Sequence, residues 1–212
     1  MNKTKIEWCD YTINPIKGLC RNDCWYCYAK RMYKRFKWDE HIELDPKVFN
    51  DVVKLKEPSR IFVGSTHDIF GDWIPHHWIC EIIDTCNQYP KHTFIFLTKF
   101  PKRYVEFIFN NNCWLGTSIT GIENNQSHLW GSFSGMNNIK FISYEPLLGE
   151  PDILASYLSR PSWIIVGGLT PKPMHKNWWV EQLMNEFKNT PIFLKDNLKW
   201  HKKIQEFPEV II

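Results

Sequence analysis

The sequence lacks the features that mark secreted, membrane-spanning and low-complexity proteins. No apolar signal segment opens the chain, and no apolar run is long enough to cross a bilayer. Internal repeats and biased tracts are missing too. The seven cysteines are an odd number, which suits a reducing compartment better than a framework of disulfides. We therefore expect a cytoplasmic protein with no membrane partner.

A strong net charge and two common catalytic signatures are also absent. The 26 basic and 23 acidic residues nearly balance, so overall charge does not require a nucleic-acid partner. The sequence contains neither a Walker-type phosphate loop nor the nucleophile elbow of serine hydrolases. What is present is a chain of 212 residues, 43% of them hydrophobic, which predicts one globular domain over residues 1–212.

Short apolar runs alternate with segments of helical spacing. The runs are apolar at nearly every position, which is typical of parallel strands buried on both faces. A first strand is expected within Ile6–Ile13, and further strands at Arg60–Gly64, Thr93–Thr98, Trp114–Ile119, Lys140–Tyr144, Trp163–Gly167 and Pro191–Lys195. Helices are expected over Trp25–Lys37, from Pro46, Pro75 and Pro101 onward, and over Glu123–Phe133, Asp152–Ser159 and Asn177–Lys188.

This alternation predicts βαβ units with right-handed crossovers and a parallel sheet. The chain is short for a complete eight-fold barrel. We therefore expect an α/β fold in the form of an open or partial (βα)6 TIM-like barrel.

Three cysteines stand close together just ahead of the first expected helix. Cys20, Cys24 and Cys27 have the spacing C-x3-C-x2-C, and thiolates at such a spacing bind iron-sulfur clusters, zinc or copper(I). A four-iron cluster held by three thiolates keeps one iron open for another ligand. A structural zinc site needs four ligands, and Cys9 is the candidate for the fourth ligand beside the three cysteines of the loop. Chance clustering of reduced cysteines is the third interpretation.

Polar residues follow most of the expected strands. In parallel α/β folds ligands bind at these carboxyl ends, although strand ends are also polar simply because they emerge into solvent. The residues concerned are Ser65, Thr66, Asp68, Thr98, Lys99, Thr117, Ser118, Ser143, Glu145, Gly167, Gly168, Lys195 and Asp196.

A series of motifs extends this pattern over nearly the whole chain. They are KIEWCDYTINPIKGLC, CWYCYAKR, IFVGSTHDIF, FIFLTKFPKRY, CWLGTSI, KFISYEPLLG, WIIVGGL and PIFLKD. In this order they resemble a family of small, often phage-encoded proteins of unknown function that are similar to radical S-adenosylmethionine (radical SAM) enzymes. The resemblance implies a partial barrel, a 4Fe-4S cluster and S-adenosylmethionine, but no particular substrate. The chain departs from the family pattern at Cys9, where threonine is expected, and at Leu169, where glutamate is common.

The resemblance also implies roles for individual residues. Cys20, Cys24 and Cys27 would be the cluster ligands. Among the cofactor-binding residues, Tyr26 would lie near the adenine through its backbone, and Gly64, Ser65 and Thr66 would lie near the methionine amino group. Ser118 and Glu145 would lie near the ribose hydroxyls or the methionine carboxylate. Gly167 and Gly168 would lie beside the adenosine. The cluster would be reduced by an external flavodoxin-like or ferredoxin-like donor.

The substrate is less well defined. Asp68, Lys99 and Lys195 are candidates for catalytic substrate contacts, and the two lysines predict an anionic group; the alternative for the lysines is a solvated rim charge. The basic run from Lys30 to Lys37 indicates either a nucleotide or nucleic-acid substrate or a solvated helix face. A different class of function also stays open, in which the cysteines form a non-catalytic zinc- or cluster-binding module that docks on nucleic acid.

Overall fold

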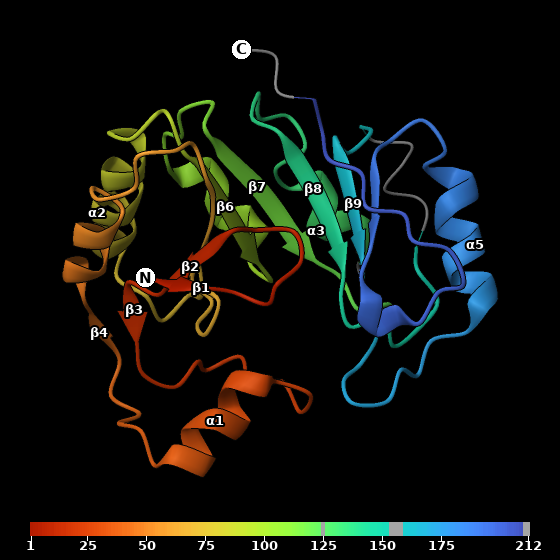
Figure 1. Cartoon of the computed structure of the whole chain (residues 1–212), viewed down its shortest axis with the longest axis horizontal. Helices are drawn as coiled ribbons and strands as arrows, with labels where there is room; N and C mark the ends of the chain where they lie inside the picture. The colour runs from red at the N-terminus through yellow and green to blue at the C-terminus, as the bar shows by residue number, and fades with distance from the viewer. Residues whose placement is uncertain (124–125, 153–158, 210–212) are drawn as a thin grey trace. The chain divides into compact units, whose positions relative to one another are not determined.

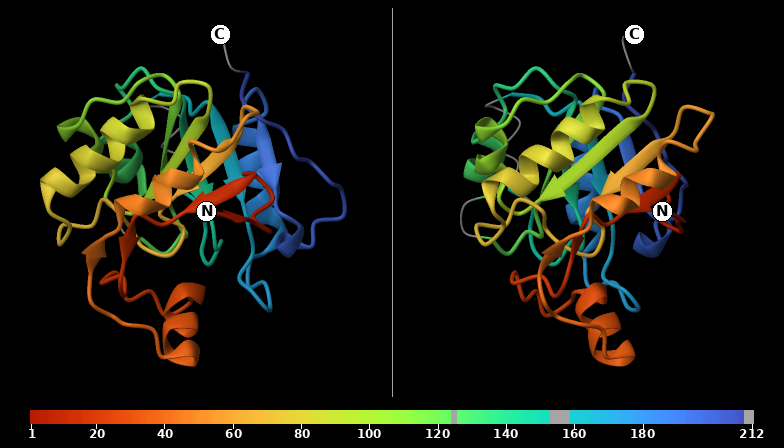
Figure 2. Two further views of the ribbon diagram at one scale, coloured as in Figure 1. Left: turned by 60° about the vertical axis from the view of Figure 1, so that its left-hand side comes forward. Right: turned by 90° about the vertical axis from the view of Figure 1, so that its left-hand side faces the viewer.

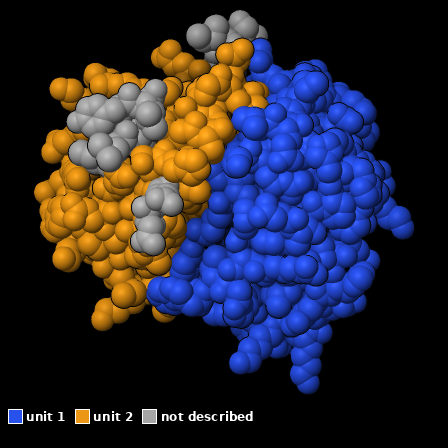
Figure 3. Space-filling view, turned by 180° about the vertical axis from the view of Figure 1, so that it is seen from behind, with its two compact units in different colours: residues 1–114 blue, residues 115–212 orange. Residues whose placement is uncertain are grey.

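The computed structural model describes residues 1–123, 126–152 and 159–209. The chain divides into two compact units, Met1–Trp114 and Leu115–Ile212 (Figure 3). Each unit contributes parallel strands with helices beside them (Figure 1). Within the described residues, no helix has both the length and the apolar character needed to cross a membrane.

The first unit is built on a small, mainly parallel sheet. Its strands, in spatial order, are β1 (Asn2–Lys3), β2 (Tyr11–Ile13), β5 (Arg60–Val63) and β6 (Thr93–Thr98). β2 pairs in parallel with β5 and β5 with β6, whereas β1 lies antiparallel on β2. The centre of β6 is completely buried, which explains its unbroken apolar sequence.

The first strand, expected within Ile6–Ile13, is β2, which occupies the last three residues of that range. Trp8 and Cys9 lie in a turn, in which the backbone N–H of Cys9 donates to the Ile6 carbonyl at 3.3 Å. The buried Trp8 side chain packs on Phe62 instead of taking a place in the strand, with ring centroids 4.8 Å apart. Packing of this large side chain therefore outweighs the local preference for an extended chain.

The connections of the first unit are two α-helices, two 3-10 helices and a two-stranded ribbon. They are β3 (Ile16–Lys17), α1 (Tyr28–Phe36), β4 (Glu43–Leu44), η1 (Pro46–Asp51), α2 (His76–Asn87) and η2 (Pro101–Glu106). α2 follows its sequence pattern, because Ile79, Ile82, Ile83 and Cys86 form its buried stripe.

The α-helices expected from Pro46 and Pro101 are short 3-10 helices. Each begins at its proline, as the fixed φ of proline favours. η2 ends because Phe107 adopts an extended backbone and packs on Phe70, with ring centroids 6.0 Å apart. Tertiary packing of aromatic rings thus overrides helix propagation there.

The second unit continues the βα alternation. Its elements are β7 (Cys113–Ser118, which starts two residues before the unit), α3 (Gln126–Gly131), β8 (Lys140–Tyr144), β9 (Trp163–Val166), α5 (Asn177–Glu186), β10 (Ile192–Leu194) and η3 (Asp196–Leu198). β7, β8, β9 and β10 pair in parallel in that order. The helix expected over Asp152–Ser159 lies largely outside the described residues.

Candidate functional site

The cysteine loop leads from β3 into α1. Cys20, Cys24 and Cys27 are all half-buried, and none of them is in a disulfide. The backbone N–H of Cys27 donates to the Cys24 carbonyl at 3.0 Å, which folds the second half of the loop into a turn. Cys27 is the N-cap of α1 but makes no side-chain capping hydrogen bond, so its thiol is not used by the helix.

A buried histidine from another segment anchors the start of this loop. His67 follows β5, and its Nδ1 lies 3.0 Å from the Gly18 carbonyl oxygen. Its Nε2 accepts a hydrogen bond from Trp73 Nε1 at 2.9 Å, which assigns the proton to Nδ1. Burial lowers the pKa of His67. The neutral ring therefore links the loop to the end of the sheet.

Gly18 itself can only be glycine. Its φ is +91°, and a Cβ there would lie 2.2 Å from the carbonyl oxygen of His41. The left-handed conformation and this close approach both exclude a side chain. The chain can therefore pass between His67 and the segment before β4 without a clash.

Asp68 braces the middle of the cysteine loop. Its carboxylate accepts a hydrogen bond from Asn22 Nδ2 at 3.1 Å, and others from Thr98 Oγ1 at 2.5 Å and the Lys99 backbone N–H at 2.9 Å. A further bond comes from the Phe70 N–H at 3.2 Å. Burial raises the pKa of Asp68, and these hydrogen bonds oppose the shift. One carboxylate thus joins the loop to the ends of β5 and β6.

The first cysteine lies beside this brace. Burial raises the pKa of the Cys20 thiol to about 11, while hydrogen bonds from the backbone of Asp68 and Asn22 lower it. Without a metal, Cys20 is therefore a neutral thiol near pH 7. Because only the thiolate is a metal ligand, binding of iron or zinc would release a proton from Cys20.

The Gly64-Ser65-Thr66 turn is held next to the same loop. Gly64 has a φ of +84°, and the Asn14 side-chain oxygen accepts from Ser65 Oγ at 3.1 Å and from the Thr66 N–H at 3.0 Å. Tyr28, the residue after the third cysteine, donates its hydroxyl to the Ser65 carbonyl at 2.6 Å. Three polar groups of the turn are thereby fixed in place.

Lys99 also lies at this end of the first unit. Its ammonium is 5.7 Å from the centroid of the Tyr26 ring, within the range of a cation–π contact. The structure therefore gathers Tyr26, Lys99, Asp68 and the glycine turn around the cysteine loop, as strand-end logic predicts.

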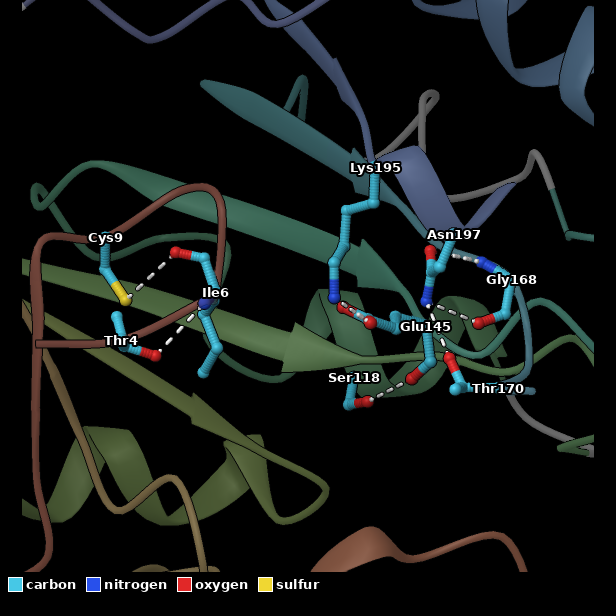
Figure 4. Close-up of polar contacts among 9 residues, drawn as sticks. All are labelled: Thr4, Ile6, Cys9, Ser118, Glu145, Gly168, Thr170, Lys195 and Asn197. Carbon is cyan, nitrogen blue, oxygen red and sulfur yellow. Dashed lines mark hydrogen bonds and ion pairs between the residues drawn. The ribbon is translucent and has the colours of Figure 1, made fainter. Parts of the chain in front are cut away.

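The remaining predicted residues cluster within the second unit, at the ends of β7, β8, β9 and β10. Glu145 and Lys195 form an ion pair there, with side chains only 23% and 13% exposed (Figure 4). Ser118 Oγ donates to the Glu145 carbonyl at 3.3 Å. A Cβ on Gly167 would lie 2.9 Å from Glu145 Cγ and Cδ, so the glycine leaves room for the carboxylate.

Gly168 is held by an asparagine that the sequence analysis did not single out. Asn197 Oδ1 accepts from the Gly168 N–H at 3.1 Å, and Asn197 Nδ2 donates to the Gly168 carbonyl at 2.8 Å. Figure 4 shows this double contact beside the Glu145–Lys195 pair. Gly167 thus lies against the carboxylate of the ion pair, and the side-chain amide of Asn197 holds Gly168.

The loop thiols fit an iron-sulfur centre by donor chemistry. Three free, half-buried thiols lie on one short loop, and soft thiolates are the ligands that such clusters require. The described residues contain no group of three or more His, Cys, Asp or Glu side chains gathered tightly enough to hold a single metal ion.

Cys9 does not extend this donor set. It lies before β2, whereas Asn14, which contacts the Ser65 turn, lies after it. β2 separates the two by roughly 10 Å of extended chain. The buried Cys9 thiol instead points at the Ile6 carbonyl, 3.9 Å away (Figure 4). Cys9 thus lies at the opposite end of β2 from the residue that contacts the Ser65 turn.

Comparison with known proteins places the chain in a family. A family model described as "Protein of unknown function (DUF5131)" matches residues 3–207. The chain belongs to this family. A search of curated proteins finds no match.

The fold of this DUF5131 protein is similar to that of spore photoproduct lyase. A structure of that enzyme complexed with dinucleoside spore photoproduct aligns with a TM-score of 0.61 at 13% identity, covering 89% of this chain and 64% of the lyase. The structure of a tyrosine-to-phenylalanine variant of the lyase aligns with a TM-score of 0.61 at 14% sequence identity. That of a cysteine-to-serine variant aligns with a TM-score of 0.60 at 13% identity. The DUF5131 chain thus spans less than two thirds of the length of these lyase chains.

Spore photoproduct lyase is a radical SAM enzyme, and the match is to its partial TIM-type barrel. The expected α/β fold, a partial (βα)6 barrel of the radical SAM type, is therefore confirmed. At this identity the likeness shows the fold alone. It assigns no roles to individual residues.

Four residues that hold the site together escaped the sequence analysis. Asn14, Asn22, His67 and Asn197 are ordinary polar residues in sequence, and their partners lie between 29 and 52 residues away. Asn14 and His67 stand inside quoted motifs and Asn22 stands between the first two loop cysteines, whereas Asn197 lies outside every motif.

Proposed function

We propose that this protein is a radical SAM enzyme whose Cys20, Cys24 and Cys27 hold a 4Fe-4S cluster. The observation that carries the proposal is the cysteine loop itself. Its three free thiols lie on a segment that His67 and Asp68 bind to the ends of β5 and β6, in a chain with the partial barrel of such enzymes.

The bound groups would supply a 5'-deoxyadenosyl radical by reductive cleavage of S-adenosylmethionine. The chain's own residues would bind and orient that cofactor and keep water away. In the first unit, the Gly64-Ser65-Thr66 turn and the backbone of Tyr26 are the cofactor contacts. In the second unit, we assign that role to Ser118, Glu145, Gly167 and Gly168.

The geometry divides the candidate catalytic residues into two kinds. The Asp68 carboxylate accepts hydrogen bonds from Asn22 in the cysteine loop and from the segments that support this loop, so we assign Asp68 to positioning. Lys195 is engaged with Glu145, and we assign it to holding that carboxylate in place. Lys99, beside Tyr26, is our candidate for contact with an anionic group of the substrate. An external flavodoxin-like or ferredoxin-like donor would reduce the cluster.

The test is anaerobic reconstitution with iron and sulfide. We expect about four irons per chain and the brown absorption of a cluster. Cys20→Ala, Cys24→Ala or Cys27→Ala should each abolish it. Cys80→Ala is the matched control, because Cys80 is also half-buried but lies on α2. A colourless protein with one zinc per chain, or loss of iron in Cys9→Ala equal to that in Cys20→Ala, would overturn the proposal.

A further inference from the structure

α1 carries a strongly basic face that points away from its packing face. Ala29 and Tyr33 are its buried residues. Residues three and four apart share a helix face. Lys30 and Lys34 therefore form one row and Arg31 and Arg35 the next, and all four side chains are exposed. Both views of Figure 2 show α1 standing out from the strands of the first unit.

Most of these cations are not neutralised. Lys30 pairs with Asp23, but the described residues give no ion-pair partner to Arg31, Lys34 or Lys37. Asp39 and Glu40 follow the helix, and the Asp39 carboxylate accepts from the backbone N–H of His41. A row of unpaired cations on a projecting helix attracts a polyanion.

Large aromatic rings interleave with the cations. Trp25 before the helix is 64% exposed, and Phe36 and Trp38 at its end are 52% and 43% exposed. The Phe36 and Trp38 rings stack with centroids 5.4 Å apart, and the Arg35 guanidinium lies 5.3 Å from the Phe36 centroid. Exposed rings beside cations are the two parts of a surface that binds single-stranded nucleic acid, because phosphates meet the cations and bases stack on the rings.

We propose that the α1 arm, residues 21–38, binds a single strand of nucleic acid. A duplex would satisfy the cations, but its stacked bases could not reach the rings. An acidic protein such as an electron donor would also satisfy the cations, yet it offers no repeated flat groups for Trp25, Phe36 and Trp38.

The arm begins at the cysteine loop. Its first helical residue, Tyr28, directly follows Cys27, and Lys30 in the first turn of α1 forms an ion pair with Asp23 inside the cysteine loop. A strand held along α1 would therefore run toward the loop thiols. That this strand is also the substrate rests on the proposed function, whereas binding itself does not.

The experiment is fluorescence anisotropy with labelled single strands of about twelve nucleotides, within the usual site size of such surfaces. Single-stranded DNA, single-stranded RNA, a duplex of the same length and an abasic strand are compared on metal-free and reconstituted protein. We expect the base-bearing single strands to bind at least ten-fold more tightly than the duplex or the abasic strand.

Two multiple-substitution variants test the cations and the aromatic rings of the α1 arm separately. Arg31→Gln/Lys34→Gln/Arg35→Gln should weaken binding and reduce the slope of log affinity against log salt by about two. Trp25→Ala/Trp38→Ala should cost roughly ten-fold or more for base-bearing strands but little for the abasic strand. Lys47→Gln/Lys56→Gln/Lys102→Gln makes the same charge change at exposed lysines elsewhere in the first unit and should leave binding unchanged apart from a small general charge effect.

Equal losses in the arm and control triple variants would overturn the proposal, as would equal binding of duplex and single strand. Competition by an acidic peptide that is as strong as competition by unlabelled single strand would identify an acidic-protein dock instead. Cys20→Ala separates the two proposals, because it should lose the cluster but keep nucleic-acid binding. Conversely, strand binding by a protein that never takes up iron would leave this inference standing and overturn the proposed enzyme.

Discussion

Asn22, between the first two cysteines of the loop, donates a hydrogen bond to the carboxylate of Asp68, 46 residues away in the chain. The same carboxylate binds the end of β6 through Thr98 and Lys99. The loop that carries the thiols is therefore positioned by the sheet rather than by its own sequence.

Asp68→Asn should loosen the cysteine loop. The amide keeps the size of the side chain but has one acceptor oxygen in place of two, so at least one buried donor loses its partner, at a cost of about 1–3 kcal/mol. We expect faster release of iron from the reconstituted protein to a chelator. Asp72→Asn, at an exposed position four residues on, is the control. Equal rates in the two variants would remove Asp68 from the support of the loop.

Gly18→Ala should have a similar effect through the backbone. The new Cβ would have to fit a φ of +91° and a carbonyl oxygen 2.2 Å away, so the segment before Cys20 must move. We expect low iron content after reconstitution and a lower unfolding midpoint. Gly135→Ala is the matched control, since a Cβ at that position would meet no atom within 4 Å other than those of its chain neighbours. Normal iron content in Gly18→Ala would show that the loop tolerates the shift.

Lowering the pH should destabilise the protein through His67. Burial lowers the pKa of His67 in the folded state. Below the pKa of histidine in the unfolded chain, about 6.5, the unfolded chain therefore binds a proton that the folded chain does not bind. The contribution of His67 is thus fully present above that pH and is lost as the pH falls below it. Urea unfolding at pH 7.5 and 5.5 measures the change. His67→Gln should be less stable at pH 7.5 but less sensitive to pH, with residual sensitivity from His92 and His175, whose pKa values are also lowered. An unchanged pH dependence in His67→Gln would rule His67 out as its source.

The Glu145–Lys195 pair should behave as a coupled unit. Lys195→Met leaves the carboxylate without its cation, and Glu145→Gln leaves the lysine without its anion. Because both side chains are partly buried, we expect a coupling free energy of about 1–2 kcal/mol in a double-mutant cycle of unfolding. Additive single effects would mean that solvent screens the pair completely.

The parallel strands could be predicted from the sequence because runs such as Phe94 to Phe96 are apolar at every position, as burial on both faces demands. The gathering of Ser65, Asp68 and Lys99 at strand ends followed from the same reasoning. The supports could not be predicted in this way. Asn14 and Asn22 are polar loop residues whose roles depend on contacts made only after the sheet has formed.

Two features that the sequence did not reveal have the same origin. The ends of β8 and β10 bring Glu145 and Lys195 together as an ion pair. The helix expected from Pro101 stops early because Phe107 and Phe109 pack around Phe70. In both cases the structure depends on contacts between residues far apart in the chain, which the local sequence does not specify.

The central claim is that the loop cysteines support reductive cleavage of S-adenosylmethionine. The most direct measurement is 5'-deoxyadenosine and methionine released by the anaerobically reconstituted, chemically reduced protein, with Cys20→Ala treated in parallel. We predict slow release of both products by the wild type even without substrate, and none by Cys20→Ala. An intact four-iron cluster with bound S-adenosylmethionine but neither product would contradict the account and indicate a binding protein.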